Sequence, residues 1–266
     1  MNHSARPSRR TVAVIYAGDS QPARGEPGGP GGPGGLGGPG ELGGPGGLGG
    51  PGERGGRGQP AGPDLLAPLA GRPLVEHSLA AFAAAPGVDE VMMIAGPALA
   101  GRTYDPAPEI VRDRGSRAGS IAVVLEVLTA IGPKDECDVL IHDADHPLIG
   151  VRVIADCLAA LADSEAVCAA VSASDTMVAV ENGVITDRPP RDRLRYRQYP
   201  QGFRLPVIRR GYQLALSDPA FRQTDDCAVV LRYLPEVPVR LVPGSERGFR
   251  ITSQAGIGIA ETLLGG

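Results

Sequence analysis

The sequence predicts an α/β fold in which a mostly parallel sheet is flanked by helices. Short continuous apolar runs are typical of strands buried on both faces of such a sheet, and they occur at residues 11–17, 88–95, 139–141 and 166–172. Apolar side chains at helical spacing occur between these runs, at residues 74–82, 116–130 and 151–161. Strands that alternate with helices of about 10 to 15 residues predict right-handed βαβ units around a parallel sheet.

The remaining elements complete this pattern and add one projection. Further strands are predicted at residues 109–111, 238–242 and 249–252, and further helices at 205–215, 225–234 and 255–264. Residues 177–186 predict a β-hairpin, because Asn182-Gly183 is the strongest short hairpin signal. A Pro- and Arg-rich stretch follows, and we expect residues 175–198 to project from the core as a dimerisation arm.

Length, charge and cysteine content restrict the class of protein. The 266 residues can build one large α/β domain or two small ones, and the net charge of −4 argues against a nucleic-acid-binding surface. The four cysteines lack a CxxC pair, which indicates reduced thiols and not a zinc site or disulfide framework. No stretch approaches the about 20 apolar residues of a membrane helix, so we expect a soluble, cytoplasmic protein without membrane partners.

A glycine- and proline-rich segment interrupts the domain near its start. Glycine recurs at every third position from Gly25 to Pro60, which is formally a collagen-like Gly-X-Y period. Most X positions are themselves glycine, so a flexible, disordered insertion at residues 25–62 is favoured over a triple helix. We expect residues 1–10 to be disordered and residues 11–266 to form a single domain around this insertion.

The most informative segment is the apolar run that ends in His142-Asp143-Ala144-Asp145-His146-Pro147. In open α/β sheets the ligand crevice lies beyond the carboxyl ends of the strands, where these residues would stand. Carboxylate oxygens are the ligands that a hard cation bridging phosphates requires. The alternative interpretation is that Asp143 or Asp145 only caps the next helix, as an aspartate in an arbitrary loop usually does. The motifs in the rest of the chain favour the ligand-binding interpretation.

These motifs occur in a fixed order that resembles the 2-C-methyl-D-erythritol 4-phosphate cytidylyltransferase family. The segments that carry the resemblance are residues 69–78 (LAGRPLVEHS), Arg117-Ala-Gly-Ser120, His142-Asp143-Ala144 with Pro147, Asp175-Thr176-Met177, residues 191–203 (RDRLRYRQYPQGF), Thr224-Asp225-Asp226 and Arg250-Ile-Thr252. The resemblance covers nearly the whole chain outside the glycine repeat. It implies a Rossmann-like sheet, a homodimer and CTP-dependent cytidylyl transfer to a sugar-alcohol phosphate.

The resemblance also implies roles for individual residues. Asp143 would bind Mg²⁺ and act in catalysis with Arg250 and, as a substitute for a missing arginine, Arg24. The nucleotide would be bound by Ala17, Gly18, Arg117, Ser120, Asp143 and Arg250. The acceptor would be bound by Asp175, Thr176, Arg191, Thr224 and His146, some of them reaching into the partner subunit. Catalysis would consist mainly of positioning and charge neutralisation.

The nucleotide loop departs from the family pattern, which runs Ala-Ala-Gly-x-Gly-x-Arg and ends in Pro-Lys. Ser20 stands at the second glycine, Pro22 at the arginine and Asp64 at the lysine. Elsewhere His146 replaces an arginine, Tyr199 the threonine of Thr-Pro-Gln, Arg114-Gly115 a usual Gly-Asp pair, and Gly248 an asparagine. Arg54 or Arg57, within the repeat, could also supply positive charge to the phosphates.

The leading hypothesis is a cytidylyltransferase that makes CDP-methylerythritol for non-mevalonate isoprenoid synthesis. A pentitol phosphate such as ribitol 5-phosphate is the alternative acceptor. The missing lysine and arginine favour a second class, a catalytically silent homologue that binds nucleotide or a partner and regulates. A third possibility is an interaction protein whose partner binds the glycine repeat.

Overall fold

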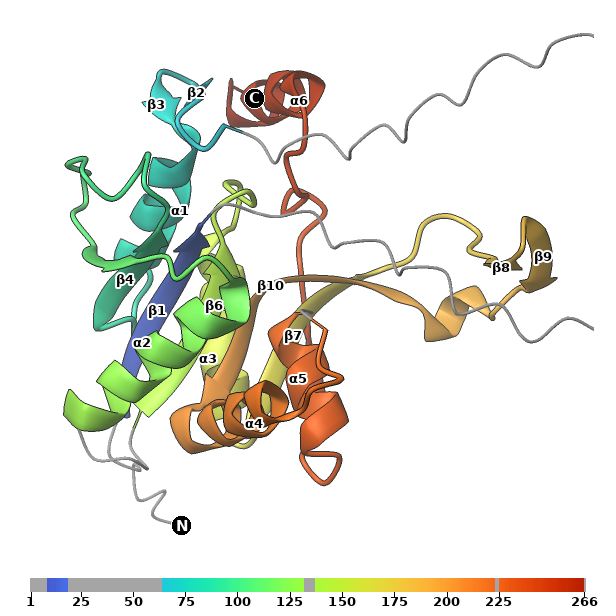
Figure 1. The fold of residues 1–266 in the computed structure, drawn as a ribbon. Helices are drawn as coiled ribbons and strands as arrows, with labels where there is room; N and C mark the ends of the chain where they lie inside the picture. The colour runs from blue at the N-terminus through green and yellow to red at the C-terminus, as the bar shows by residue number, and fades with distance from the viewer. Residues whose placement is uncertain (1–8, 19–63, 132–136, 223–224, 266) are drawn as a thin grey trace, which may run out of the picture.

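One central sheet organises the molecule (Figure 1). The computed structural model of the chain describes residues 9–18, 64–131, 137–222 and 225–265. Within these residues seven strands form a sheet in the order β11-β7-β10-β6-β1-β4-β5. The strands are β1 (Arg10–Ala17), β4 (Glu90–Ala95), β5 (Glu109–Arg112), β6 (Cys137–Asp143), β7 (Ala166–Ser172), β10 (Arg195–Arg204) and β11 (Val239–Pro243).

Strand pairing is parallel except at β10. The pairs β1–β4, β1–β6, β4–β5 and β7–β11 are parallel, whereas β10 lies antiparallel between β6 and β7. The predicted α/β fold with a mostly parallel sheet is therefore confirmed. The sequence patterns did not predict β10, and its first residues, 195–198, fall in the segment that we expected to belong to the arm.

Helices cover both faces of the sheet. One face packs against α2 (Arg117–Ile131), α4 (Leu205–Ser217) and α5 (Asp226–Tyr233), and the other against α1 (Leu74–Ala83) and α3 (Val151–Leu161). Along β1, Val12 and Val14 enter the first layer, and Ala13 and Ile15 enter the second. A strand that buries both faces has no solvent side, which explains its unbroken apolar sequence.

A smaller apolar cluster joins the end of the chain to the segment before α1. The pair β2 (Pro68–Leu69) and β3 (Arg72–Pro73) packs near α6 (Gln254–Gly265) through Leu69, Ile251 and Ile257. The predicted strand at residues 249–252 is wrong, because this segment does not join the sheet. Its Ile251 N–H donates to the Asp145 carbonyl (2.8 Å), so the segment crosses the strand ends above β6.

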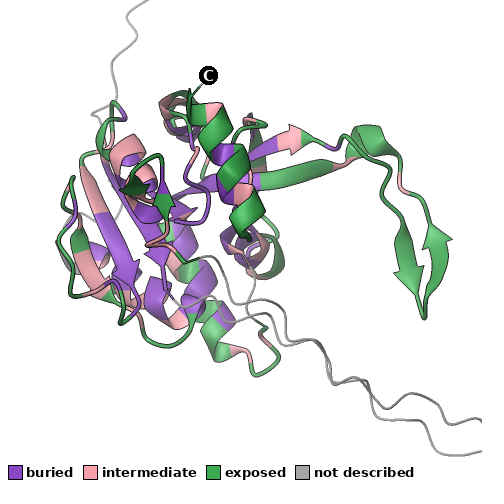
Figure 2. Cartoon of the chain, turned by 90° about the horizontal axis from the view of Figure 1, so that it is seen from above, coloured by how far each residue is buried: buried purple, intermediate pink, exposed green. Residues whose placement is uncertain are grey.

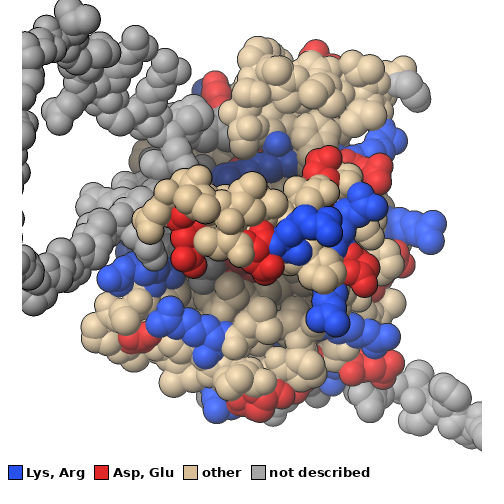
Figure 3. Space-filling model, turned by 90° about the vertical axis from the view of Figure 1, so that its right-hand side faces the viewer, with Lys and Arg blue, Asp and Glu red and all other residues tan. Residues whose placement is uncertain are grey.

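The arm extends away from the sheet in both views (Figures 1 and 2). It contains β8 (Ala179–Glu181), β9 (Val184–Asp187) and a 3₁₀ turn (Arg191–Arg193), and the predicted turn falls at Asn182-Gly183. Its strands are exposed throughout. The face of the molecule from which it projects carries positive and negative side chains close together (Figure 3).

Several expectations fall outside the described residues. These are the disordered N-terminus up to residue 8, the insertion at residues 25–62, and the site residues Arg24 and Thr224. The four cysteines are buried and none forms a disulfide, as expected. Among the described residues, no helix has the length and apolar character needed to cross a membrane.

Candidate active site

Asp143 ends the central strand β6, at the carboxyl edge of the sheet. It lies level with Tyr16 of β1, and the Ala144 N–H donates to the Tyr16 carbonyl (2.9 Å). On its other side β6 pairs with β10. β1 thus fixes the backbone at Asp143, and β10 fixes β6 up to Ile141, as a site that must hold reacting groups in place requires.

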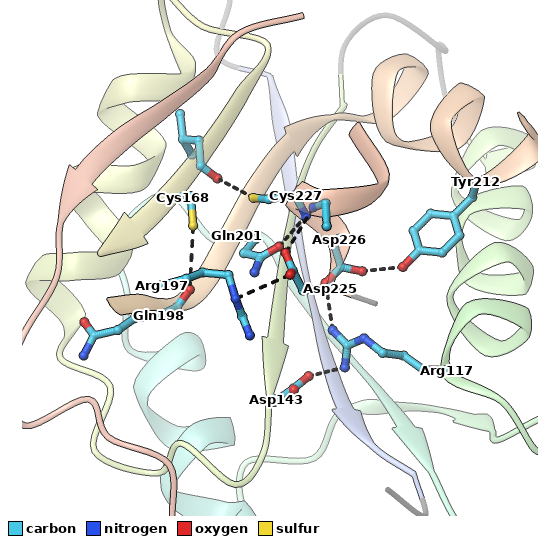
Figure 4. A network of polar contacts seen from close by, with 12 residues as sticks. Arg117, Asp143, Cys168, Arg197, Gln198, Gln201, Tyr212, Asp225, Asp226 and Cys227 are labelled. Atoms are coloured by element: carbon cyan, nitrogen blue, oxygen red, sulfur yellow. Dashed lines mark hydrogen bonds and ion pairs between the residues drawn. The ribbon is translucent and has the colours of Figure 1, made fainter. Parts of the chain in front are cut away.

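Arg117, at the start of α2, bridges two carboxylates that are far apart in the sequence (Figure 4). Its Nη1 forms an ion pair with Asp143, and its Nη2 donates to Asp226 (2.7 Å). Arg117 is only 6% exposed, so its guanidinium N–H donors are enclosed between two carboxylates of opposite charge. The Arg117 side chain therefore aligns the Asp143 carboxylate and leaves little of itself open to a ligand.

Asp226 is the buried anchor of this network. It lies in the first turn of α5, is fully buried, and accepts a hydrogen bond from the Tyr212 hydroxyl of α4 (2.5 Å). Buried charges occur in proteins when they are paired and hydrogen-bonded, and both conditions hold here. The helices α2, α4 and α5 thus meet at one carboxylate below the site.

The charge state of Asp143 follows from these contacts. Burial alone would raise the pKa of Asp143, but the Arg117 charge and hydrogen bonds from Arg117 and Tyr199 lower it below the ordinary value. Asp143 is therefore ionised at neutral pH, and 18% of its side chain remains exposed. Mg²⁺ typically binds through one or two carboxylates plus substrate phosphates, and Asp143 fits that mode. No cluster of three or more metal-ligating side chains occurs in the part of the chain that the structure describes.

Two tyrosines enclose the Arg117 guanidinium. Its Cζ lies 4.9 Å from the ring centre of Tyr16 and 5.7 Å from that of Tyr199. The Tyr199 ring also contacts Arg197, whose Cζ lies 4.9 Å from the ring centre. β10 has a register shift between Arg197 and Gln201, and such a bulge redirects the side chains around it, here at Tyr199. Aromatic faces attract cations, so the Tyr199 ring holds two arginines beside Asp143.

Three of the expected nucleotide-binding residues, Ala17, Gly18 and Ser120, lie on the β1 and β5 side of Asp143. Gly18 follows β1, and a Cβ there would lie 2.6 Å from the Tyr16 ring and 2.7 Å from the Asp113 carboxylate. Ser120, fully buried in α2, donates to Asp113 (2.5 Å) and accepts from the Arg114 N–H (2.8 Å). A larger residue at position 18 would therefore have to displace the ends of the Tyr16 and Asp113 side chains. Ala17 is buried at the end of β1.

Asp145, His146 and Arg250 form a second polar group beyond β6. The Arg250 Nε donates to Asp145 (2.6 Å), and 49% of the Arg250 side chain is exposed. Burial and the nearby Asp143 charge raise the pKa of Asp145 despite this ion pair. His146 is buried, and its Nδ1 donates to the Gly248 carbonyl (3.1 Å). Of the three side chains, Arg250 is the one that offers a positive charge to a ligand.

The expected acceptor-binding residues of the arm are not beside Asp143 of the same chain. Asp175, Thr176 and Arg191 are exposed, and Arg191 donates to the Ser174 carbonyl (3.0 Å) at the arm. Asp64, the residue at the expected lysine position, is exposed and accepts from the Leu66 N–H (2.9 Å). One chain therefore brings together Asp143, Arg117, Ser120, Arg250 and His146 at the strand ends, without the arm residues.

Sequence reasoning assigned no role to Asp226, Tyr212, Tyr16 or Arg197. Asp226 stands within the motif Thr224-Asp225-Asp226, so its position carried a signal. Its partner Arg117 is separated from it by 109 residues, and no spacing rule predicts that contact. Tyr212 lies in a segment without any recognisable motif, and Arg197 lies within residues 191–203, which the resemblance includes, but at a position to which it gave no role.

Comparison with known proteins agrees with the fold and the motifs. The sequence profile described as 2-C-methyl-D-erythritol 4-phosphate cytidylyltransferase matches residues 49–266. A Thermobifida fusca protein of that name is 44% identical over 218 residues, covering 77% of this chain and 86% of the relative. A Haemophilus influenzae bifunctional ribulose 5-phosphate reductase/CDP-ribitol pyrophosphorylase is 31% identical over 211 residues, which cover 76% of this chain and 44% of that protein.

Solved structures give the same result. The 2-C-methyl-D-erythritol 4-phosphate cytidylyltransferase of Thermus thermophilus superposes with a TM-score of 0.65 at 28% identity, covering 78% of this chain and 96% of that one. A 4-diphosphocytidyl-2C-methyl-D-erythritol synthase from Anaerococcus prevotii has a TM-score of 0.71 at 20% identity, over 97% of this chain and 100% of its own, and supports the fold. The chain belongs to the 2-C-methyl-D-erythritol 4-phosphate cytidylyltransferase family.

Proposed function

We propose that this protein transfers the cytidylyl group of CTP to 2-C-methyl-D-erythritol 4-phosphate, releasing pyrophosphate and CDP-methylerythritol. The observation that carries the proposal is family membership, with 44% identity to a relative of that name over 218 residues. In this reaction an oxygen of the acceptor phosphate forms a bond to the α-phosphorus of CTP. The bond from that phosphorus to the bridging oxygen breaks, and pyrophosphate leaves with the electron pair.

The residues at the strand ends supply positioning and charge for such a displacement. The Asp143 carboxylate, held by Arg117, is an oxygen ligand suited to Mg²⁺, and the metal would neutralise phosphate charge when bound. Arg250 is exposed enough to contact a phosphate directly. Gly18, Asp113 and Ser120 form the cradle in which we place the cytidine. These assignments agree with a reaction that depends on positioning and electrostatics.

We further infer that the protein acts as a homodimer through its arm. The arm exposes large apolar side chains at Met177, Val178, Val180, Val184 and Ile185, each between 41% and 65% exposed. Several large apolar side chains exposed on one projecting hairpin are typical of a protein–protein contact. Dimerisation would also bring Asp175, Thr176 and Arg191 to the strand ends of a second copy, where the acceptor phosphate must be held.

One assay tests the activity: pyrophosphate release by the purified protein with CTP and Mg²⁺. It is run with 2-C-methyl-D-erythritol 4-phosphate and, separately, with ribitol 5-phosphate, because the Haemophilus influenzae relative is named a CDP-ribitol pyrophosphorylase. Faster release with the first acceptor supports the proposal, and faster release with the second reassigns the substrate. Release with neither acceptor contradicts an enzymatic function and favours the silent homologue. Removing Mg²⁺ with a chelator and restoring it tests the metal requirement.

The same assay can test whether other arginines replace the charges missing from the altered nucleotide loop. Arg24, and Arg54 or Arg57 in the repeat, are the candidates to replace the arginine and lysine that the family carries there. Replacing each by alanine measures its contribution to turnover. Full activity in all three variants would exclude this compensation.

A further inference from the structure

Arg197 stands out among the positive side chains near Asp143. Arg117 is 6% exposed and bound to two carboxylates, and Arg250 donates a 2.6 Å hydrogen bond to Asp145. The Arg197 Nε is 3.6 Å from the Asp225 carboxylate, which is longer than a hydrogen bond, and 42% of the side chain is exposed. Arg197 can therefore form a short contact with an incoming anion by giving up only its long ion pair with Asp225.

The guanidinium of Arg197 is held in position although it is partly exposed. It lies over the Tyr199 ring at 4.9 Å. Burial alone would lower the pKa of Arg197, but the charges of Tyr199 and Asp225 and a hydrogen bond to the Tyr199 side chain raise it. Tyr199 also contributes to the lowered pKa of Asp143. Figure 4 shows the Arg197 side chain reaching from β10 toward Asp225. A guanidinium stacked on an aromatic ring is preorganised, so less side-chain entropy is lost when it binds an anion.

The sheet topology indicates which anion this is. Ala17 and Gly18 begin the nucleotide loop that follows β1, where the phosphates of CTP are expected, whereas Arg197 lies on β10, on the opposite side of β6. An in-line displacement requires the attacking oxygen and the leaving pyrophosphate on opposite sides of the α-phosphorus. A phosphate bound by Arg197 is therefore on the attacking side.

We propose that Arg197 binds the phosphomonoester of the acceptor and orients its attacking oxygen toward the nucleotide, beside Asp143. The proposal rests on the proposed function and adds a residue to it. Asp225 keeps a second bond, from the Ala228 N–H (3.1 Å), so it can release Arg197 and still cap α5. The planar guanidinium offers parallel N–H donors to phosphate oxygens, a geometry that lysine cannot reproduce.

The test compares Arg197→Ala with a matched control, Arg210→Ala. Arg210 is an exposed arginine of α4 that pairs at 3.2 Å with Glu236. Glu236 precedes β11, so the pair lies at the amino edge of the sheet, opposite to the site. Arg210→Ala therefore removes the same charge as Arg197→Ala, but away from the site. Loss of charge-assisted hydrogen bonds to phosphate predicts an about 10- to 100-fold higher acceptor KM for Arg197→Ala. The KM for CTP is expected to stay within about twofold of wild type. Arg210→Ala is expected to match wild type in both constants.

Three further variants separate phosphate binding from a purely structural role of Arg197. Asp225→Asn keeps the cap of α5 but removes the ion pair, so it leaves acceptor KM unchanged or lower if Arg197 binds phosphate. If Arg197 only stabilises α5 through that pair, Asp225→Asn reproduces the Arg197→Ala defect and overturns the proposal. Arg197→Gln retains the apolar stem on Tyr199 and replaces the alanine variant if that one does not fold. Arg197→Lys is expected to recover part of the affinity.

The affinity of the protein for 2-C-methyl-D-erythritol 4-phosphate, measured by calorimetry, tests the role of Arg197 independently of the proposed function, because binding does not depend on turnover. The proposal predicts binding to wild type and Arg210→Ala that is lost or greatly weakened in Arg197→Ala. Equal affinity of wild type and Arg197→Ala overturns it even if the enzyme is active. Binding that requires Arg197 without any pyrophosphate release would contradict the function and support the phosphate site. Absence of binding to wild type overturns both.

Discussion

Replacing Asp226 by asparagine tests whether the buried network holds Arg117 in place. Asp226 is fully buried and accepts two short hydrogen bonds, from Arg117 (2.7 Å) and Tyr212 (2.5 Å). Asparagine has the same shape but offers one oxygen and an amide donor, so it can accept from one partner while its N–H₂ group faces the other. One charge-assisted hydrogen bond is lost, and a buried donor is left without an acceptor.

The expected cost is about 1.5–3 kcal/mol of unfolding free energy, the value for hydrogen bonds to charged groups. Arg117 keeps its ion pair with Asp143, so the larger penalty of an isolated buried charge does not apply. For a domain of this size each kcal/mol lowers the melting temperature by about 2–4 °C. We therefore expect Asp226→Asn to melt about 3–12 °C below wild type.

The assay is thermal unfolding followed by circular dichroism, with urea unfolding to obtain the free energy. Asp218→Asn is the matched control, because Asp218 also accepts from a tyrosine hydroxyl (Tyr233, 2.6 Å) and an arginine (Arg232, 3.1 Å), but on the surface. Water replaces lost partners there, so the control shifts far less. A melting temperature within about 1 °C of wild type for Asp226→Asn would refute the reasoning, as would equal shifts in both variants.

Four other expectations follow from the same structure. Arg117→Lys should lower kcat for pyrophosphate release by about tenfold or more, because an ammonium cannot bridge the two carboxylates as the guanidinium fork does; a kcat near wild type would contradict this. Val184→Asp should shift the protein from dimer to monomer in light scattering, and a monomeric wild type would refute the arm contact. Burial raises the pKa of Cys157 to about 12 from 9.0, so above pH 9 the unfolded chain loses a proton that the native protein keeps. Stability under reducing conditions should therefore fall as pH rises from about 9 to 10.5, at most by about 1.4 kcal/mol per pH unit from this group, and Cys157→Ala should show a shallower slope. Deleting residues 28–51 should leave the melting temperature unchanged, because this segment consists of glycine and proline apart from Glu41 and three leucines and so has little apolar surface to bury.

Most of the sheet could be predicted from the sequence because most of its strands are buried on both faces. Strands such as β1 and β7 appear as apolar runs, and burial alone specifies such a pattern. β10 escaped prediction although it is a central strand, because it contains arginines, a proline and a glycine. Pro200 falls inside the register shift between Arg197 and Gln201, where the ladder is already interrupted and a missing N–H costs little.

The candidate site, like the sheet, could be predicted only in part from the sequence. Asp143 and Ser120 belong to short motifs at strand and helix ends, where local sequence fixes the position of a side chain. The contact of Arg117 with Asp226 depends on how α2, α4 and α5 pack on one face of the sheet, and no local pattern encodes it. The predicted strand at residues 249–252 failed for a related reason, since Ile251 bonds to the Asp145 carbonyl above β6 and not to a strand.

The charges around Asp143 explain how a chain with an altered nucleotide loop could still support catalysis. Arg117 is neutralised by Asp143 and Asp226, and the pair of Arg250 with Asp145 is also balanced, so the described site has little net positive charge of its own. Two phosphate-bearing substrates cannot approach each other there unless further cations contribute. Mg²⁺, if it binds at Asp143 as proposed, is one such source, and the partly exposed Arg250 and Arg197 are others in the described part of the fold, provided that each exchanges its aspartate partner for phosphate. If the contributions of Mg²⁺ and Arg197 are both needed, Arg197→Ala and Mg²⁺ depletion should each impair acceptor binding, and CTP binding should depend on the metal more strongly than on Arg197.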